Sequence, residues 1–261
     1  MNKLKAIARR LSENQFLFSE LVKRDFKKKY KGTYLGMIWS ILSPLLTLLV
    51  MRLVFTHFFG ADIPHYTIYL FCGNIVFAFF NEATNTGMSS LLENAHIFSK
   101  INVPKYLFLF SKNVSALINF GLTFCVFILF CVIDGVPFTL TFLALPFPII
   151  CLICFNLGIG LILSALYVFF RDVQYLWGVF TMLLMYMSAI FYRVDTFPPE
   201  IQRLFLLNPL FVYIKYFRLA VLGGTLPSIQ YHLLALGYAA ISMLVGLLMY
   251  KKCSEKFLYY V

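Results

Sequence analysis

Several long stretches of this chain contain no charged residue. Among them are Thr33–Met51, Asn113–Ile133, Gly135–Phe170 and Val173–Tyr192. Each is about long enough to cross a bilayer as an α-helix, which takes about 20 apolar residues. Over the whole chain only 13% of residues are charged, against about 25% in soluble domains. The pattern predicts an all-α, polytopic membrane protein. It excludes a soluble enzyme, a nucleic-acid-binding protein and a secreted disulfide scaffold.

Basic residues gather near the two ends of the chain. Ten of the 22 Lys and Arg residues lie within residues 1–31, and three follow Tyr250. Segments rich in Lys and Arg remain in the cytoplasm, so we predict that both termini are cytoplasmic, which requires an even number of spans. The net charge of +11 is thereby explained by membrane topology, and no nucleic-acid partner is predicted.

The apolar pattern predicts six spans between a cytoplasmic N-terminus (1–32) and a cytoplasmic tail (251–261). Residues 197–225 contain an apolar run too short to cross the membrane and interrupted by Asn208-Pro209, so we expect an outer re-entrant helical hairpin there. The six spans fall at about 33–56, 66–90, 113–133, 143–169, 175–192 and 229–250. This topology leaves five basic residues on the outer side: Arg52, Arg193, Arg203, Lys215 and Arg218.

Residues 14–31 have the pattern of an amphipathic helix. Phe18, Val22, Phe26 and Tyr30 recur every four residues, and basic residues occupy the other faces. A helix of this kind lies in the membrane interface with its basic side toward anionic head groups. An ordinary solvated helix is the alternative, which the position directly before a span disfavours.

Motifs for catalysis or metal binding are absent from the sequence. It has no G-x-x-x-x-G-K-[ST] for nucleotide phosphates, and none of its four histidines pairs with another at the spacing of metal ligands. The pair Cys151-x-x-Cys154 lies in an apolar span without His or acidic neighbours, which favours packing over chemistry. We therefore predict no catalytic residue, no metal site and no cofactor held by this chain.

Several motifs resemble those of one transporter family. The run from Lys29 to Trp39 resembles the basic-Tyr-…-Leu-Gly-…-Trp signature that begins span 1 of type-two ABC export permeases, the membrane subunits that export O-antigen polysaccharide, capsule or teichoic acid. Glu93–Lys100, followed by Val103-Pro104, is similar to their cytoplasmic coupling helix. Phe169–Val173 resembles their Phe-Arg-Asp loop between spans 4 and 5. Phe197-Pro198-Pro199 and Asn208-Pro209 fall where the family has outer re-entrant helices.

The resemblance implies a permease of the cytoplasmic (inner) membrane that moves a lipid-linked glycan outward through a homodimer interface. Two separate ATPase subunits would bind ATP and Mg, and a coupling helix at about 93–102 would transmit their closure to the spans. The residues implied in coupling are Asn94, His96, Ile97, Phe98, Ser99, Lys100, Arg171 and Asp172. Arg24, Lys27 and Tyr30 would belong to an interfacial gate that admits the lipid-diphosphate head group.

The residues themselves add expectations about the coupling segments. Ile97 and Phe98 are apolar, and no core of the chain is apparent to bury them, so they are expected to face a partner groove or, alternatively, to anchor in the membrane interface. Arg171 and Asp172 lie in a connection too short to hold a domain, so we expect them to cap the ends of the flanking helices.

Candidate residues for a glycan path come from aromatic content, which is 18% of the chain. Aromatic faces stack against sugar rings, although Tyr and Trp also gather at membrane interfaces. The candidates are Tyr34, Trp39, Tyr175, Trp177, Tyr186 and Tyr192. Glu82, in the polar half of the second span, either lines the cytoplasmic mouth of a cavity or pairs with Arg171 or Lys112.

Two other functions are compatible with parts of the sequence. One is a type-two ABC permease for a drug or a lipid, and the other is a membrane-bound glycan-modifying enzyme. The enzyme would require a cluster of acids or histidines at one membrane face, which the sequence lacks.

Overall fold

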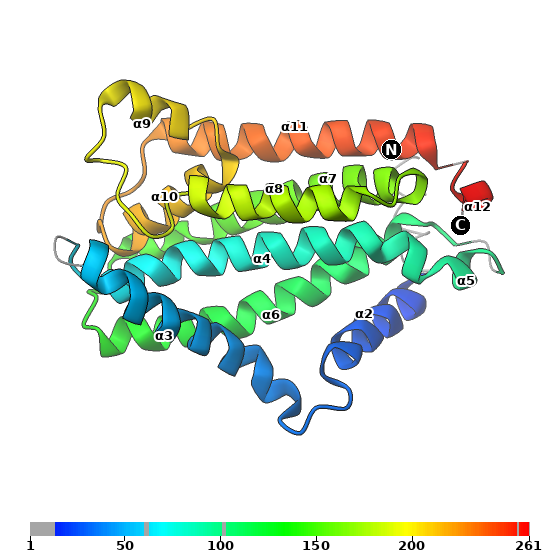
Figure 1. Cartoon of the computed structure of the whole chain (residues 1–261), viewed down its shortest axis with the longest axis horizontal. Coiled ribbons are helices and arrows are strands. Elements are labelled where there is room, and N and C mark those ends of the chain that lie inside the picture. The colour runs from blue at the N-terminus through cyan, green and yellow to red at the C-terminus, as the bar shows by residue number, and fades with distance from the viewer. Residues whose placement is uncertain (1–13, 60–62, 101–102, 255, 261) are drawn as a thin grey trace.

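The computed structural model describes residues 14–59, 63–100, 103–254 and 256–260, and within these ranges all regular structure is helical. A short 3₁₀ turn at Gly36–Ile38 precedes α3, and another at Leu140–Ala144 precedes α7. The helices shown in Figure 1 are α2 (Gln15–Tyr30), α3 (Trp39–Phe59), α4 (Tyr66–Glu93), α5 (Ala95–Phe98), α6 (Tyr106–Ile133), α7 (Pro146–Phe169), α8 (Val173–Met187), α9 (Pro199–Phe205), α10 (Pro209–Val221), α11 (Ile229–Cys253) and α12 (Phe257–Tyr260).

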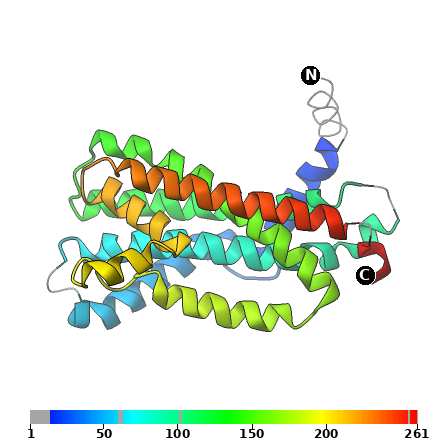
Figure 2. The same ribbon diagram turned by 90° about the horizontal axis from the view of Figure 1, so that it is seen from above.

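Four long helices form an elongated bundle. Helix α4 packs against both α6 and α7, and α11 packs along α7. Helices α2, α5 and α12 gather at one end of the bundle, while α9 and α10 lie at the other (Figures 1 and 2). The two ends of the described chain thus lie on one side of the bundle, as an even number of spans would require.

The lengths of the helices agree with much of the predicted topology. Four segments are long and apolar enough to cross a membrane: Gly36–Thr56, Tyr106–Ile133, Leu140–Phe169 and Ile229–Cys253. They correspond to predicted spans 1, 3, 4 and 6. Helices α9 and α10 are bent by 105° relative to each other, in agreement with a broken or re-entrant pair. Helix α4 is long but polar in its second half, and the count of six spans stays a prediction.

Two helices differ in length from the spans predicted there. Helix α6 begins at Tyr106, so Lys112, expected in a cytoplasmic loop, lies within the helix. Helix α8 ends at Met187 after 15 residues, although the charge-free run continues to Tyr192. The chain leaves the helix there because Ala189 has a left-handed backbone, with φ of 53°, and because its carbonyl oxygen accepts a hydrogen bond from Arg218 instead of a helical amide.

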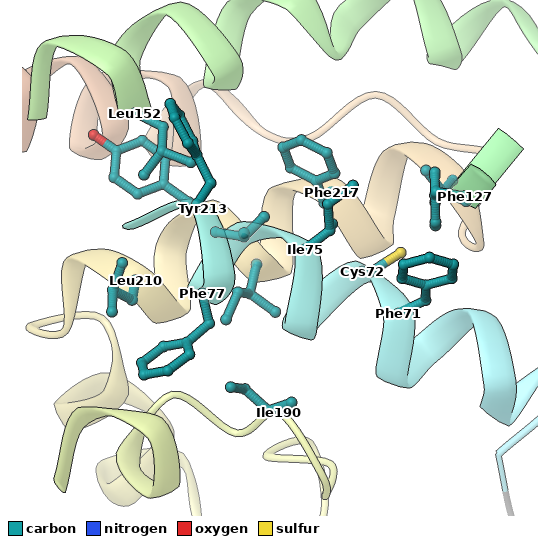
Figure 3. Packing of buried hydrophobic residues seen from close by; sticks show 14 of the residues in the cluster. Phe71, Cys72, Ile75, Phe77, Phe127, Leu152, Ile190, Leu210, Tyr213 and Phe217 are labelled. Atoms are coloured by element: carbon teal, nitrogen blue, oxygen red, sulfur yellow. The ribbon is translucent and has the colours of Figure 1, made fainter. Parts of the chain in front are cut away.

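The largest core joins α4 to α10 and to the helices around them. In Figure 3, Ile75 of α4 lies beside Phe217 of α10, and Phe71 of α4 lies beside Phe127 of α6, with ring centres 5.4 Å apart. The Tyr213 hydroxyl donates to the carbonyl oxygen of Ala235, 2.9 Å away, because a buried hydroxyl needs a partner. This core fixes the short α10 against the long helices although α10 is not itself a span.

Small residues allow α7 and α11 to approach each other closely. A Cβ atom on Gly246 would lie 2.5 Å from the carbonyl oxygen of Gly158, and a Cβ on Gly158 would lie 2.4 Å from the carbonyl carbon of Ser242. Both contacts are with backbone, which cannot rotate away. Packing of this kind is typical of helix pairs in membranes, where close van der Waals contact drives association.

Gly246→Ala should therefore destabilise the protein by about 1–3 kcal/mol, the usual cost of overpacking. Gly237→Ala is the matched control on the same helix, because a Cβ there meets nothing within 4 Å. The measurement is the thermal unfolding midpoint of each purified variant in detergent. Equal midpoints for the two variants would contradict the close crossing of α7 and α11.

Candidate functional site

Helix α2 does not lie free in the interface but packs against α6. Its buried residues are Leu21, Asp25 and Tyr30, a different face from the stripe that the four-residue repeat predicted. Of that stripe only Tyr30 is buried, and Phe18, Val22 and Phe26 are half-buried. These three half-buried side chains are suited to contact with the membrane interface.

A cluster of charged side chains joins α2 to α4 and α6. The Lys112 ammonium lies 3.0 Å from a Glu93 carboxylate oxygen and 3.5 Å from an Asp25 oxygen. Only 8% of the Lys112 side chain and 3% of the Asp25 side chain are exposed. On α2, Arg24 donates both to Asp25 and to the side-chain oxygen of Asn94. Buried charges are tolerated when they are paired or hydrogen-bonded, so the cluster holds α2 in place.

Glu93 lies just beyond the predicted second span. Burial by itself would raise the pKa of Glu93, but hydrogen bonds from Ser89 and Lys112 and the charges of Lys112 and Lys28 lower it to about 2. The group stays ionised at physiological pH, and its contribution to stability is lost only as the pH falls from about 4.5 toward 2.

A cavity of about 490 Å³ opens beside this cluster, between the end of α2 and helices α3, α4 and α6. Its lining mixes polar and apolar groups: Lys29, Tyr30, Thr33, Trp39, Ser40, Ser43, Pro44, Thr47, Asn74, Ile75, Ala78, Phe79, Glu82, Ala116, Asn119, Phe120 and Thr123. A second cleft of about 530 Å³, nearer the charged cluster, shares Lys29 and Glu82 with it. These two side chains therefore stand where the cavity and the cleft meet.

Polar side chains from three helices are connected at this point. The Lys29 ammonium donates to Glu82 Oε1 at 2.7 Å, and the Asn119 side-chain amide donates to the same oxygen at 2.6 Å. The Tyr30 hydroxyl in turn donates to Asn119 Oδ1 at 3.0 Å. Glu82 thus faces the protein and a cavity, as expected, but its partner is Lys29 and not Arg171 or Lys112.

The other expected path residues divide into two groups. Trp39 lines the cavity with Glu82. Tyr34 is fully exposed and does not line the cavity, and Tyr175 and Tyr186 lie on the exposed side of α8. Trp177 packs on Phe80 and donates to the Thr84 hydroxyl, and the Tyr192 hydroxyl donates to the Tyr186 carbonyl oxygen. The structure therefore does not bring the α8 aromatics together with Trp39.

Some residues of the cavity were not predicted. Lys29, Asn74, Asn119 and Thr123 line it, and two of them, Asn119 and Thr123, lie four residues apart within an otherwise apolar span. Polar residues spaced by one helical turn share a face, so this pair could have indicated a polar face on the span. Of the expected gate residues only Tyr30 lines the cavity, since Arg24 points to Asn94 and Lys27 is exposed.

The expected coupling segment is shorter and better packed than predicted. Helix α5 has four residues, and residues 101–102 lie outside the described part. Phe98 is buried against Phe108, with ring centres 5.9 Å apart, and Ile97 is half-buried. The expectation that no core could bury them is wrong, because α5 folds back onto α6. Asn94 is also buried, whereas His96, Ser99 and Lys100 are exposed.

Arg171 and Asp172 form the turn between α7 and α8, at the same end of the bundle as α5 (Figures 1 and 2). Both are exposed. Asp172 directly precedes α8, but its side chain makes no capping hydrogen bond, and Arg171 lies over the Tyr167 ring. The two residues lie between the helix ends, but Asp172 does not supply the side-chain cap that was predicted for α8.

Comparison with known proteins identifies the family. A family model described as ABC-2 type transporter matches residues 17–222, which include α2, the cavity and α10. The chain belongs to this family. Membership of the ABC-2 family makes it a multi-pass membrane protein and implies an ATPase partner that uses ATP and Mg. Among the described residues, no group of three His, Cys, Asp or Glu side chains could hold a metal ion.

Similar curated proteins cover nearly the whole chain. One is the O-antigen export system permease protein RfbA of Klebsiella pneumoniae, 28% identical over 248 residues, or 93% of this chain and 95% of that protein. Another is RfbA of Myxococcus xanthus, 27% identical over 78% of this chain and 79% of that protein. The polysialic acid transport protein KpsM of Escherichia coli is 23% identical over 90% of this chain and 92% of that protein.

Proposed function

We propose that this chain is the permease subunit of an ABC exporter that moves a lipid-linked polysaccharide outward across the inner membrane. The observation that carries the proposal is the similarity, over nearly the full length of both chains, to proteins named for O-antigen export and for polysialic acid transport. Polysaccharide is therefore the substrate class that we favour over teichoic acid, a drug or a simple lipid.

The cavity beside α2 is the proposed binding site for the head group of the lipid-linked glycan. Its volume of about 490 Å³ falls within the range of about 300–1,000 Å³ that is typical of ligand sites. Lys29 offers a charged donor for phosphate, and Asn74 and Asn119 offer amides for sugar hydroxyl groups. Trp39 offers an aromatic face for a sugar ring. Because α2 forms one wall, a shift of α2 would widen the opening of the cavity.

Coupling to the ATPase is proposed at the end of the bundle that carries α5. There the exposed residues His96, Ser99 and Lys100 follow α4, and Arg171 and Asp172 occupy the α7–α8 turn. Phe98 supports this surface from within rather than contacting the partner. We place this end, and with it both termini, in the cytoplasm, because most Lys and Arg residues lie there.

A homodimer is proposed through the faces of α3 and α8. Both helices lie along one side of the bundle in Figure 2 and expose large apolar side chains, such as Leu49 and Leu53 on α3 and Leu176 and Val179 on α8. The buried residues of α8 are limited to Thr181. Two copies related by a two-fold axis would cover these faces and enclose a path between them.

The export function is tested by deleting the gene for this chain and measuring polysaccharide on the cell surface and lipid-linked glycan inside the cell. Deletion should abolish surface polysaccharide and cause lipid-linked glycan to accumulate. Ala78→Phe, which fills the cavity from α4, should reproduce the defect at normal protein level. Ala240→Phe, on an exposed part of α11, is the matched control and should export normally. Unchanged surface polysaccharide after deletion would refute the proposed function.

The proposed assembly is tested by the mass of the complex purified in detergent through a tag on this chain and co-expressed with its ATPase. We expect two copies of each subunit. A mass corresponding to one copy of each would contradict the homodimer.

Docking at α5 is tested with a His96→Ala, Lys100→Ala double variant, and full recovery of the ATPase with this variant would contradict it. Phe98→Ala is instead expected to lower the thermal unfolding midpoint, because it opens a cavity in the core.

A further inference from the structure

Basic residues also gather at the end of the bundle opposite to α2. Arg193, Arg203, Lys215 and Arg218 all belong to the segment between α8 and α11, and they line two adjoining clefts of about 210 and 220 Å³ there. Segments on the outer side of a membrane are generally poor in Lys and Arg. The four basic residues around these two small clefts therefore do not follow this rule, and the export proposal does not explain them.

Arg218 is the most deeply placed of these residues, with 6% of its surface exposed. Its guanidinium donates to three carbonyl oxygens: Ala189 and Ile190 at 2.8 Å, and Tyr69 at 3.2 Å. The group also lies 3.4 Å from the centre of the Tyr69 ring. Among the residues that the structure describes, no carboxylate lies within 4 Å of it. Within the described part of the chain, Arg218 thus has hydrogen-bond acceptors but no carboxylate in direct contact.

The cleft that Arg218 lines contains more positive than negative charge. Arg193 and Lys215 line it as well, and Asp195 is its single described carboxylate. Asp195 already pairs with Lys215 at 2.7 Å and with Arg193 at 3.5 Å. The described side chains that line the cleft thus carry three positive charges and one negative charge within a partly enclosed space. A low-dielectric wall strengthens the attraction of such a cleft for an anion.

We propose that this cleft binds a phosphate group. Phosphate matches the donors because its oxygens accept from guanidinium groups and from an ammonium at the same time. The carbonyl contacts of Arg218 occupy four of its five N–H groups and hold it in place, so Arg218 supplies mainly a fixed positive charge, and Arg193 and Lys215 supply the donors for the ligand. The phosphate comes either from a phospholipid head group of the adjacent leaflet or from a soluble phosphate compound, and the chemistry of the cleft is the same for both.

The test is the thermal unfolding midpoint of the purified protein in a neutral detergent, with sodium phosphate or with sodium chloride at equal ionic strength. A second arm compares nanodiscs of phosphatidylglycerol with nanodiscs of phosphatidylcholine. The variants are Arg193→Gln and Lys215→Gln, because substituting Arg218 would leave buried carbonyl oxygens without a donor. The controls are Arg203→Gln, which lines only the neighbouring cleft, and Lys251→Gln on α11.

Phosphate should raise the midpoint of the unaltered protein in a saturable way. Each cleft variant should raise the half-saturating phosphate concentration about tenfold, as expected for the loss of one charged hydrogen bond, while the controls should behave like the unaltered protein. If phosphatidylglycerol but not free phosphate stabilises the protein, and the cleft variants lose that effect, the source is a lipid head group. Either result supports the proposal.

Two results would overturn the proposal. The first is that neither phosphate nor phosphatidylglycerol distinguishes the cleft variants from the controls, which would place any anion effect elsewhere on this basic protein. The second concerns Asp62, which lies outside the described residues. If phosphate stabilises an Asp62→Asn variant but not the unaltered protein, the chain supplies its own counter-charge and the cleft is not a phosphate site.

Discussion

Charges withdrawn from water must be paired or hydrogen-bonded, and this constraint organises the molecule at the α2 end of the bundle. Transferring a lone carboxylate or ammonium out of water costs several kcal/mol, so the buried Asp25 and Lys112 are paired with each other, and Lys112 is also paired with the more exposed Glu93. Because they come from α2, α4 and α6, their pairing sets where α2 lies. The cavity exists beside α2 because α2 is held there while α3 departs from the bundle at an angle (Figure 1).

The same constraint explains how the second half of α4 can be polar. Residues of this half, including Glu82, Thr86 and Glu93, face the cavity, the cleft or a charged partner, so the bilayer does not have to accept them. The apolar faces of α3 and α8 are exposed instead, where lipid or a second copy of the chain can cover them. Polar groups thus turn toward the site that we propose for the head group, and apolar groups turn toward the membrane.

Much of the architecture was predictable because membrane spans are encoded by local hydropathy. The boundaries of span 4, the start of α11 and the broken α9–α10 pair followed from runs of apolar residues and from Asn208-Pro209. Contacts between distant segments were not predictable in this way. The burial of Lys112 depends on Asp25, 87 residues earlier in the chain, and the end of α8 depends on Arg218. The burial of Phe98 was missed for the same reason, because the side chains that cover it belong to α6.

The most direct test of this account is a double-mutant cycle on Asp25 and Lys112, with Asp25→Asn, Lys112→Met and the double variant. The free energy of unfolding is measured by titration with sodium dodecyl sulfate in mixed micelles. Each single change should cost about 3–5 kcal/mol, and the double variant should cost less than the sum by about 0.5–3 kcal/mol. The exposed Glu20–Lys23 pair on the same helix is the control, with a coupling energy below about 0.5 kcal/mol. Additive losses at Asp25 and Lys112 would show that α2 is not held by this cluster and would contradict the account.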